Sequence, residues 1–551
     1  MMTALDWMIV FVLNGAVIGY GFYLARGTTT SSEWFLGSRA LPWWAIGLSM
    51  FATNVDSGDL VSVTGQTYKE GLHIITVYAL GSAVGGILAA FWLVPAMARA
   101  SFYTNAEYLE ARFGAAARVL SALIQIQYRS SMLGMMIWSI HILLTELLHL
   151  DSQLAWWLIV AMVVFSGCYT AWGGLKSVVW TDAAQSVIMI LGFAVIFGSV
   201  WHEVGGWSAM QTGLEEQGTA DLVHSGKFHT DLGNVPPTVD ELSPFLVALG
   251  WIIIGAGYWT VNHTQTMRLM GARSLWDMKM AAILGVAVSL PIMIACTTLG
   301  LFGRVLYPGL ESVDQVLPRL ADDYLSTGLK GLFVAGVVAA AVSTFDSMGS
   351  ALSAVFIRDI YARLLVSDRN DAHYVLASRV ATVAILALGF LYLPFIIHQK
   401  NMLKAFTTLV PVFVTPLFTM YMLGVFTRAA RRSGVAGLVG GGIYGVVALY
   451  DREITDVAWL EPWFTGQWVA LSWSVVWTAL SMGIATWVFG PQPKDEPLAF
   501  QETGWLAHSR ETLPPLRDHP FAHRIPALCR PGWYAILLLV VMTYVTFGLF
   551  W

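Results

Sequence analysis

Long apolar stretches recur along almost the whole chain, separated by short polar segments. A helix needs about 20 mostly apolar residues to cross the ~30 Å hydrocarbon core of a bilayer. The stretches that meet this length lie at residues 5–24, 41–63, 73–97, 118–147, 153–171, 178–201, 244–267, 278–302, 330–357, 373–397, 403–426, 433–450, 468–490 and 531–550. The pattern therefore predicts an all-α membrane protein with about 14 transmembrane helices.

The composition excludes a protein that folds in water. Hydrophobic residues make up 56% of the chain and charged residues 12%, whereas soluble proteins are about 25% charged. No basic patch indicates a nucleic-acid partner, and no feature of the sequence indicates an obligate protein partner. The three cysteines, Cys168, Cys296 and Cys529, fall in predicted spans or in a cytoplasmic segment, so we expect neither a disulfide framework nor a metal cluster.

The basic residues indicate how the chain is oriented, because Lys and Arg concentrate in cytoplasmic loops. If the N-terminus lies outside, most of the 30 Lys and Arg residues fall in cytoplasmic loops, among them Arg268, Arg273 and Lys279. Both ends of the chain are then expected outside. The predicted location is the inner membrane of a bacterium, crossed many times.

The spans form two groups of five on either side of the longest predicted external loop. Because five is odd, the second group starts from the opposite side of the membrane, which is typical of the inverted repeats of transporters. We expect a first helix and loop at 1–40, repeats at 41–203 and 243–427, and an external loop at 204–242 between them. Peripheral helices at 428–490, a cytoplasmic linker at 491–530 and a last helix at 531–551 would follow.

The first helix of each group carries a polar interruption. Residues 51–59 read Phe-Ala-Thr-Asn-Val-Asp-Ser-Gly-Asp, and residues 250–266 are rich in glycine and then polar. Unwound backbone is tolerated in a membrane only where it is buried in protein or lines a cavity. Polar residues between packed helices are the alternative, but the matching positions in the two groups favour a pair of broken helices around a binding site.

The ninth span offers oxygen atoms for a hard cation such as sodium. Ala340, Ser343, Thr344 and Ser347 share one helical face through i, i+3, i+4 and i+7 spacing. Small and hydroxyl residues on one stripe also suit close helix packing. The spacing alone leaves both interpretations open.

Several motifs resemble those of the sodium:solute symporter family. Residues 336–353, followed by Arg358-Asp-Ile-Tyr361, resemble the family signature, and residues 172–185, 51–55 and 107–113 resemble other family motifs. The resemblance implies a LeuT-type inverted repeat of five plus five transmembrane helices with four peripheral helices, and transport by alternating access. It also implies a sodium site formed by the carbonyl groups of Ala52, Val55 and Ala340 and the hydroxyl groups of Ser343 and Thr344.

A second cation site is a further candidate. Asp182 lies within a predicted span, where a carboxylate is costly unless it is paired, and several family members use this aspartate near a second sodium ion. The matching residues on span nine are Ser343, Asp346 and Ser347, and Asp346 could instead carry a proton. An ion pair of Arg129 with Asp182 or Asp346 is the purely structural alternative.

The solute site is the least determined part. The candidate residues are Asn54, Asp56, Ser57, Asp59, Tyr78, Tyr258, Trp259, Asn262, His263 and Gln265. The Tyr258-Trp259 pair resembles the sugar branch of the family, but Tyr78, Ser289 and Thr407 stand where sugar symporters carry Glu, Lys and Gln. We favour a sugar or polyol. The alternative is an amine or amino acid bound through Asp56 and Asp59, since carboxylates beside aromatic rings suit a cation.

Other classes of function fit the sequence less well. A membrane enzyme would need a nucleophile with a base, or histidines at metal-binding spacing, and the 12 histidines are scattered. A non-transporting sensor would be expected to lose its sodium ligands, whereas all five positions keep suitable residues. We therefore predict a secondary active transporter with Na⁺ as its coupling ion, and not an enzyme.

Overall fold

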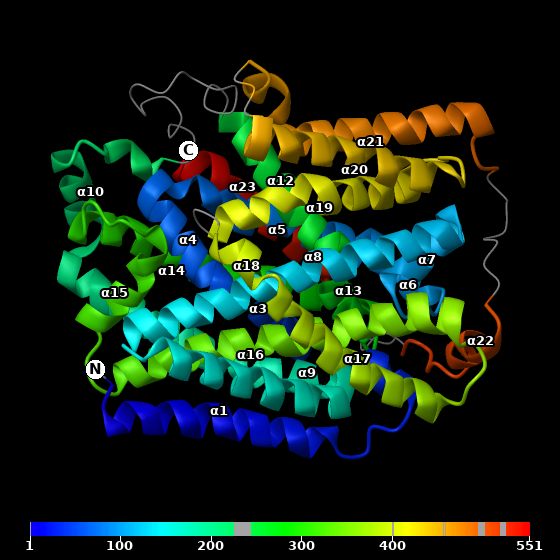
Figure 1. Ribbon diagram of the computed structural model, residues 1–551, viewed down its shortest axis with the longest axis horizontal. Helices are drawn as coiled ribbons and strands as arrows, with labels where there is room; N and C mark the ends of the chain where they lie inside the picture. Colours follow the sequence, from blue (N-terminus) through cyan, green and yellow to red (C-terminus); the bar gives the residue numbers. More distant parts are fainter. Residues whose placement is uncertain are drawn as a thin grey trace.

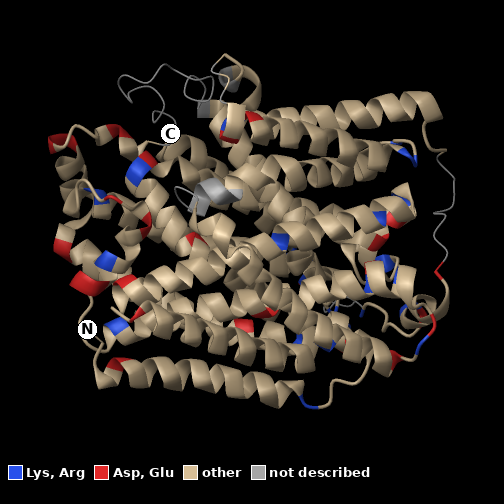
Figure 2. Cartoon of the chain, in the orientation of Figure 1, with Lys and Arg blue, Asp and Glu red and all other residues tan. Residues whose placement is uncertain are grey.

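The computed structural model describes residues 2–224, 244–398, 402–455, 457, 459–493, 502–517 and 525–551. Over these residues the chain is helical, and the one β-type contact is an isolated bridge between Leu41 and Ala272. Many of the long helices run side by side along the horizontal direction of Figure 1. Figure 2 shows most charged residues at the two ends of this bundle, with few between them. This distribution is the one expected of helices that cross a membrane.

The long helices are α1 (Ala4–Ala25), α8 (Ala115–Ile142), α9 (Ser152–Val204), α12 (Pro244–Val261), α14 (Leu275–Leu306), α16 (Leu329–Val355), α17 (Asp371–Leu391), α19 (Met402–Phe426), α20 (Ser433–Tyr450), α21 (Gln467–Phe489) and α23 (Pro531–Tyr544). The shorter helices are α2 (Ser31–Leu36), α3 (Trp43–Asn54), α4 (Ser57–Glu70), α5 (Ser82–Leu88), α6 (Val94–Arg99), α7 (Asn105–Phe113), α10 (Gly206–Glu216), α13 (His263–Met270), α15 (Val316–Tyr324), α18 (Leu393–Ile397) and α22 (Gly504–Glu511). Residues 225–242 of the predicted external loop, and 494–501 and 518–524 of the predicted linker, lie outside the described residues.

Among the described residues, eleven helices are long and apolar enough to span a membrane, and the bent pair α12 and α13 adds a twelfth. The prediction of about 14 differs for two physical reasons. The break between α3 and α4 divides the predicted span 41–63, and α9 joins two predicted spans in one element. The exact number of membrane crossings therefore stays a prediction.

Gly174 is where α9 divides. As one straight helix, its 53 residues would measure about 80 Å, far more than a bilayer core. Gly174 has φ 59° and ψ −155°, which is not helical. A Cβ atom here would also lie 2.3 Å from the Trp34 carbonyl oxygen, so both backbone angle and space require glycine. The break agrees with the predicted spans 153–171 and 178–201.

The outer surface carries large exposed apolar side chains. Phe11 on α1, Trp157 on α9, Trp487 on α21 and Leu537 on α23 are each more than half exposed. Large apolar side chains at the surface are unfavourable in water when they are this numerous, but they suit contact with lipid chains. In the interior, α16 packs against α9, α8, α17 and α1, while α3 packs against α14 and α9.

Part of the predicted linker 491–530 is docked on the bundle. The Trp505 ring of α22 stacks on Tyr374 with 3.8 Å between ring centroids, and its Nε1 donates to Asp371 Oδ1 at 2.7 Å. Trp505 is only 3% exposed. Residues 502–517, which we call the strap, therefore form a fixed part of the structure.

Candidate functional site

The first predicted break lies between α3 and α4. Val55 (φ −118°, ψ 89°) and Asp56 (φ −101°, ψ 177°) are not helical. The Asp56 side chain accepts a hydrogen bond of 2.8 Å from the Asp59 amide and so caps α4. Since the last carbonyl groups of a helix lack helical partners, Ala52, in the last turn of α3, can offer its carbonyl oxygen elsewhere.

The structure brings the proposed sodium ligands of α3 and α16 together. Ser343 Oγ donates to the carbonyl oxygens of Ala52 and Ala340, at 2.9 Å each, and Thr344 Oγ1 donates to Ala340 at 3.1 Å. These four residues and Val55 are completely buried. The result is a cluster of carbonyl and hydroxyl oxygens without a charged group, which suits a hard monovalent cation.

Asp182 lies close by, in an ion pair with Arg268. Its Oδ2 accepts from Arg268 Nη2 at 2.9 Å, from Ser49 Oγ at 2.6 Å and from Ser347 Oγ at 3.5 Å. The alternative that Asp182 pairs with Arg129 is therefore wrong, because its partner is Arg268. Arg268 was expected in a cytoplasmic loop, but α13 continues beyond the second break and carries it, fully buried, to Asp182.

Asp346 belongs to a different group of contacts. Ser166, Tyr169 and Thr170 of α9 donate to its carboxylate, with Thr170 Oγ1 at 2.8 Å. Ser347, one residue along α16, faces Thr53 and Asp182 instead. The structure thus divides the predicted second cation set: Ser347 contacts Asp182, the Ser343 hydroxyl contacts Ala52 and Ala340, and Asp346 is bonded to α9.

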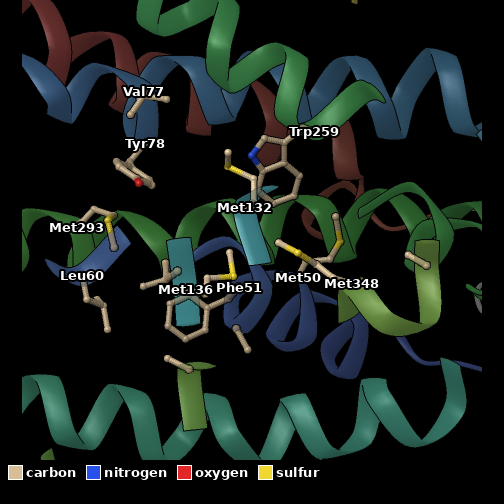
Figure 3. Close-up of a cluster of buried hydrophobic side chains, with 14 of the residues drawn as sticks. Met50, Phe51, Leu60, Val77, Tyr78, Met132, Met136, Trp259, Met293 and Met348 are labelled. Carbon is tan, nitrogen blue, oxygen red and sulfur yellow. The ribbon is translucent and has the colours of Figure 1, made fainter. Parts of the chain in front are cut away.

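A pocket lies beside the first break, lined by residues of α3, α4, α8 and α12. Five predicted solute residues line it: Asn54, Asp56, Asp59, Tyr78 and Tyr258. Hydrophobic side chains complete its wall, and Figure 3 shows part of this buried cluster, including Tyr78, Met132 and Met136. The pocket therefore combines two carboxylates with an amide, phenol groups and apolar surface.

Arg129 is the charged residue of the pocket lining that the predicted solute set did not include. Its guanidinium lies 5.4 Å from the centre of the Tyr258 ring and interacts electrostatically with Asp56 and Asp59. Arg129, Met132 and Met136 follow the i, i+3, i+7 spacing of one helical face. An arginine within a predicted span, followed by methionines on the same face, is the signal that could have placed it at a cavity.

Tyr258, which lines the pocket, is hydrogen-bonded to both α3 and Gln265. The Tyr258 hydroxyl donates to the Thr53 carbonyl at 2.9 Å, and Gln265 Nε2 donates to the Tyr258 hydroxyl at 3.1 Å. Gln265 itself does not line the pocket. Gln265 Nε2 also donates to the Met50 carbonyl at 3.4 Å, so this side chain joins α13 to α3 and α12.

The remaining predicted solute residues do not line this pocket. Trp259 is completely buried, and Ser57 accepts a hydrogen bond from Ser139 at 2.9 Å. Asn262 interrupts the helix between α12 and α13, which bend by 48°, and its Oδ1 accepts from the Thr264 amide. The His263 amide donates to Gln125 Oε1 at 3.2 Å. Asn262 and His263 therefore form the second break and its contact with α8.

A charged network closes the end of the bundle where α7 and the strap lie. Glu107 of α7 accepts from Arg358 Nε at 2.8 Å and from Arg510 Nη2 of the strap at 3.2 Å. Arg118 donates to Asp359 at 2.7 Å and also pairs with Glu107. Burial raises the pKa of Glu107, but the guanidinium groups of Arg358, Arg118 and Arg510 outweigh burial and lower it to about 2.

Comparisons with known proteins agree with this architecture. The chain is 24% identical over 486 residues to the sodium/myo-inositol cotransporter 2 of Rattus norvegicus, covering 83% of this chain and 70% of the relative. It is 26% identical over 474 residues to the sodium/glucose cotransporter of Vibrio parahaemolyticus, covering 81% and 84%.

Two solved structures share the fold. A Na⁺-coupled sialic acid symporter in a substrate-bound outward-open state has a TM-score of 0.75 at 21% identity, covering 89% of this chain and 99% of the other. The nucleobase-cation-symport-1 family transporter Mhp1 has a TM-score of 0.54 at 13% identity, with the same coverage. The predicted LeuT-type fold is thereby confirmed. The model of the sodium:solute symporter family matches residues 34–443, most of the chain, which therefore belongs to this family.

Proposed function

We propose that this protein carries a neutral polyhydroxylated solute, a sugar or polyol, into the cell together with sodium. The observation that carries the proposal is the pocket beside the first break, where Asp56, Asp59 and Asn54 offer hydrogen-bonding groups next to the Tyr258 ring. Relatives matched over most of this chain are named for sodium with glucose or with myo-inositol. The chain is a membrane transporter of a small molecule and sodium, and not an enzyme.

Sodium would bind to the oxygens of Ala52, Val55, Ala340, Ser343 and Thr344. The hydrogen bonds that join Ser343 to Ala52 and Ala340 support this assignment, because they bring the end of α3 to α16. An ion in this position would hold the two helices together. Its binding would favour the conformation in which they are joined, and its release would favour the other.

Arg129 supports a neutral solute over a simple cation. Two carboxylates alone would attract an amine, but the guanidinium beside them offsets part of their charge. An amino acid remains the second candidate, with its ammonium group on Asp56 or Asp59 and its carboxylate on Arg129. The same three side chains would bind hydroxyl groups through charge-assisted hydrogen bonds.

The location we propose is a bacterial inner membrane, with both termini outside. The marks N and C lie toward the same end of the bundle in Figure 1, whereas α7 and α22 lie toward the other. An even number of membrane crossings would give this arrangement. The excess of Lys and Arg in the loops predicted to be cytoplasmic supports the orientation, and the Vibrio relative supports the bacterial setting.

Uptake into proteoliposomes tests the proposal. Labelled myo-inositol, glucose and an amino-acid mixture would be offered with and without an inward sodium gradient. We expect sodium-dependent uptake of a polyol or sugar, and Ser343→Ala should raise the sodium concentration for half-maximal uptake about tenfold, as expected for about 1.4 kcal/mol. Ser350→Ala, a buried serine of α16 bonded to the Ser347 carbonyl, is the matched control.

Two results would contradict different parts of the proposal. Uptake that is equally fast without sodium would refute the coupling. Sodium-driven uptake of an amino acid, with none of a sugar or polyol, would replace the solute class and leave the sodium site intact.

A further inference from the structure

Asp182 is surrounded by side chains from three other helices. Ser49 comes from α3, Arg268 from α13 and Ser347 from α16, while Asp182 itself lies on α9. Arg268 Nε also donates to Ser49 Oγ at 2.7 Å, and its Nη2 donates to Ser347. Both charged side chains are completely buried. One guanidinium therefore connects groups from all four helices.

These contacts use the oxygens that a second coupling ion would need. A hard cation takes several oxygen ligands, but Asp182 Oδ2 and the hydroxyls of Ser49 and Ser347 all contact Arg268. Asp182 Oδ1 has no partner among the described residues, and a single oxygen does not make a cation site. Asp346, the other carboxylate of the predicted set, is held by α9.

The charges around Asp182 also disfavour a second sodium ion. The Arg268 guanidinium already neutralises the Asp182 carboxylate at 2.9 Å. A sodium ion at the same oxygens would lie beside this positive charge and be repelled, and the low dielectric of a buried site strengthens the repulsion. The residues present thus do not fit a second sodium ion.

We propose that Arg268 permanently takes the place of a second coupling cation, so that this transporter binds one sodium ion in each cycle. The inference rests on the proposed sodium symport. The guanidinium joins α13 to α3, α9 and α16, as an exchangeable ion would, but it is covalently part of the chain and is not released to the other side.

Binding of ²²Na⁺ to the purified full-length protein tests this inference without any solute. We expect one ion per chain and a Hill slope near one. Arg268→Gln should expose Asp182, Ser49 and Ser347 and raise the binding to two ions per chain, and adding Asp182→Asn should return it to one. Arg273→Gln is the matched control, because Arg273 is partly exposed and pairs with Asp277.

The outcomes separate this inference from the function on which it rests. Two ions bound to the unmodified protein would overturn it, whether or not the variants fold. A folded Arg268→Gln variant that binds one ion would also overturn it, because the guanidinium would then not be what excludes a second ion. Absence of saturable sodium binding in every variant would refute sodium coupling itself, and the inference with it.

Discussion

Replacing Glu107 by Gln removes one charge from the network at the α7 end and keeps the size of the side chain. Glu107 is completely buried and pairs with Arg358, Arg118 and Arg510. The pKa of Glu107 is about 2, against an ordinary value of 4.5. At about 1.4 kcal/mol per unit, its ionised form contributes about 3 kcal/mol to the free energy of unfolding. Breaking a buried pair typically costs 3–5 kcal/mol, which agrees.

The pH dependence follows from the direction of this shift. Because the pKa is lowered in the folded protein, the contribution of Glu107 is fully present above pH 4.5 and is lost as the pH falls toward 2. The assay is thermal unfolding of the purified protein in detergent at pH 7 and at several values below 4.5. We expect Glu107→Gln to unfold several degrees below the unmodified protein at pH 7, and the two curves to converge in acid.

Glu216→Gln provides the control, since Glu216 is an exposed glutamate of α10. It should unfold with the unmodified protein at every pH. Equal stability of Glu107→Gln and the unmodified protein at pH 7 would refute the reasoning. So would a difference that stays constant down to pH 2, because titration of Glu107 would then not be its cause.

Two further variants test the strap and the pocket. Trp505→Ala removes the ring that stacks on Tyr374 and the hydrogen bond to Asp371. Because truncating a buried Trp costs about 3–5 kcal/mol, we expect the strap to detach and proteases to cut residues 502–517 faster. The control Trp533→Ala, on the exposed face of α23, should leave the cutting rate unchanged. Asp56→Asn keeps a good helix cap but removes a charge from the pocket, so the melting temperature should stay the same. The solute concentration for half-maximal uptake should rise about tenfold, which corresponds to a loss of about 1.4 kcal/mol of binding free energy. Unchanged uptake would show that Asp56 does not bind the solute.

The broken helices could be predicted because their polar residues conflict with their depth in a membrane. Asp56 and Asp59 within an apolar stretch, and the run from Thr260 to Thr266, have no explanation as parts of continuous lipid-facing helices. Gly174 lies in the short segment that separates two predicted spans. These features depend only on residues that are neighbours in the sequence, so they can be predicted without knowing how the helices pack.

The partners of buried charges could not be predicted, because they depend on how helices rotate against each other. Asp182 pairs with Arg268 and not with Arg129, since α13 continues further than its polar sequence indicated. The position of Arg129 in the pocket depends equally on the rotation of α8. The partners of Asp346 were visible in retrospect, because Ser166, Tyr169 and Thr170 share one face of α9 through i, i+3, i+4 spacing.

The docking of the strap also could not be predicted from the sequence. A segment rich in proline and charge is typical of a loop, and only the fold shows that Trp505 is covered by Tyr374 and Arg358.

The strap is held by hydrogen bonds and ring contacts to residues other than those that we assign to sodium or solute. A chain cut after α21 would keep both five-helix repeats and every residue assigned to sodium or solute, yet it would lose Arg510 and Trp505 from the α7 end. Detaching the strap would break its contacts with Glu107 of α7, with Arg358, and with Asp371 and Tyr374 of α17. We therefore expect changes in residues 502–517 to alter the α7 end of the protein while the sodium and solute ligands keep their own contacts.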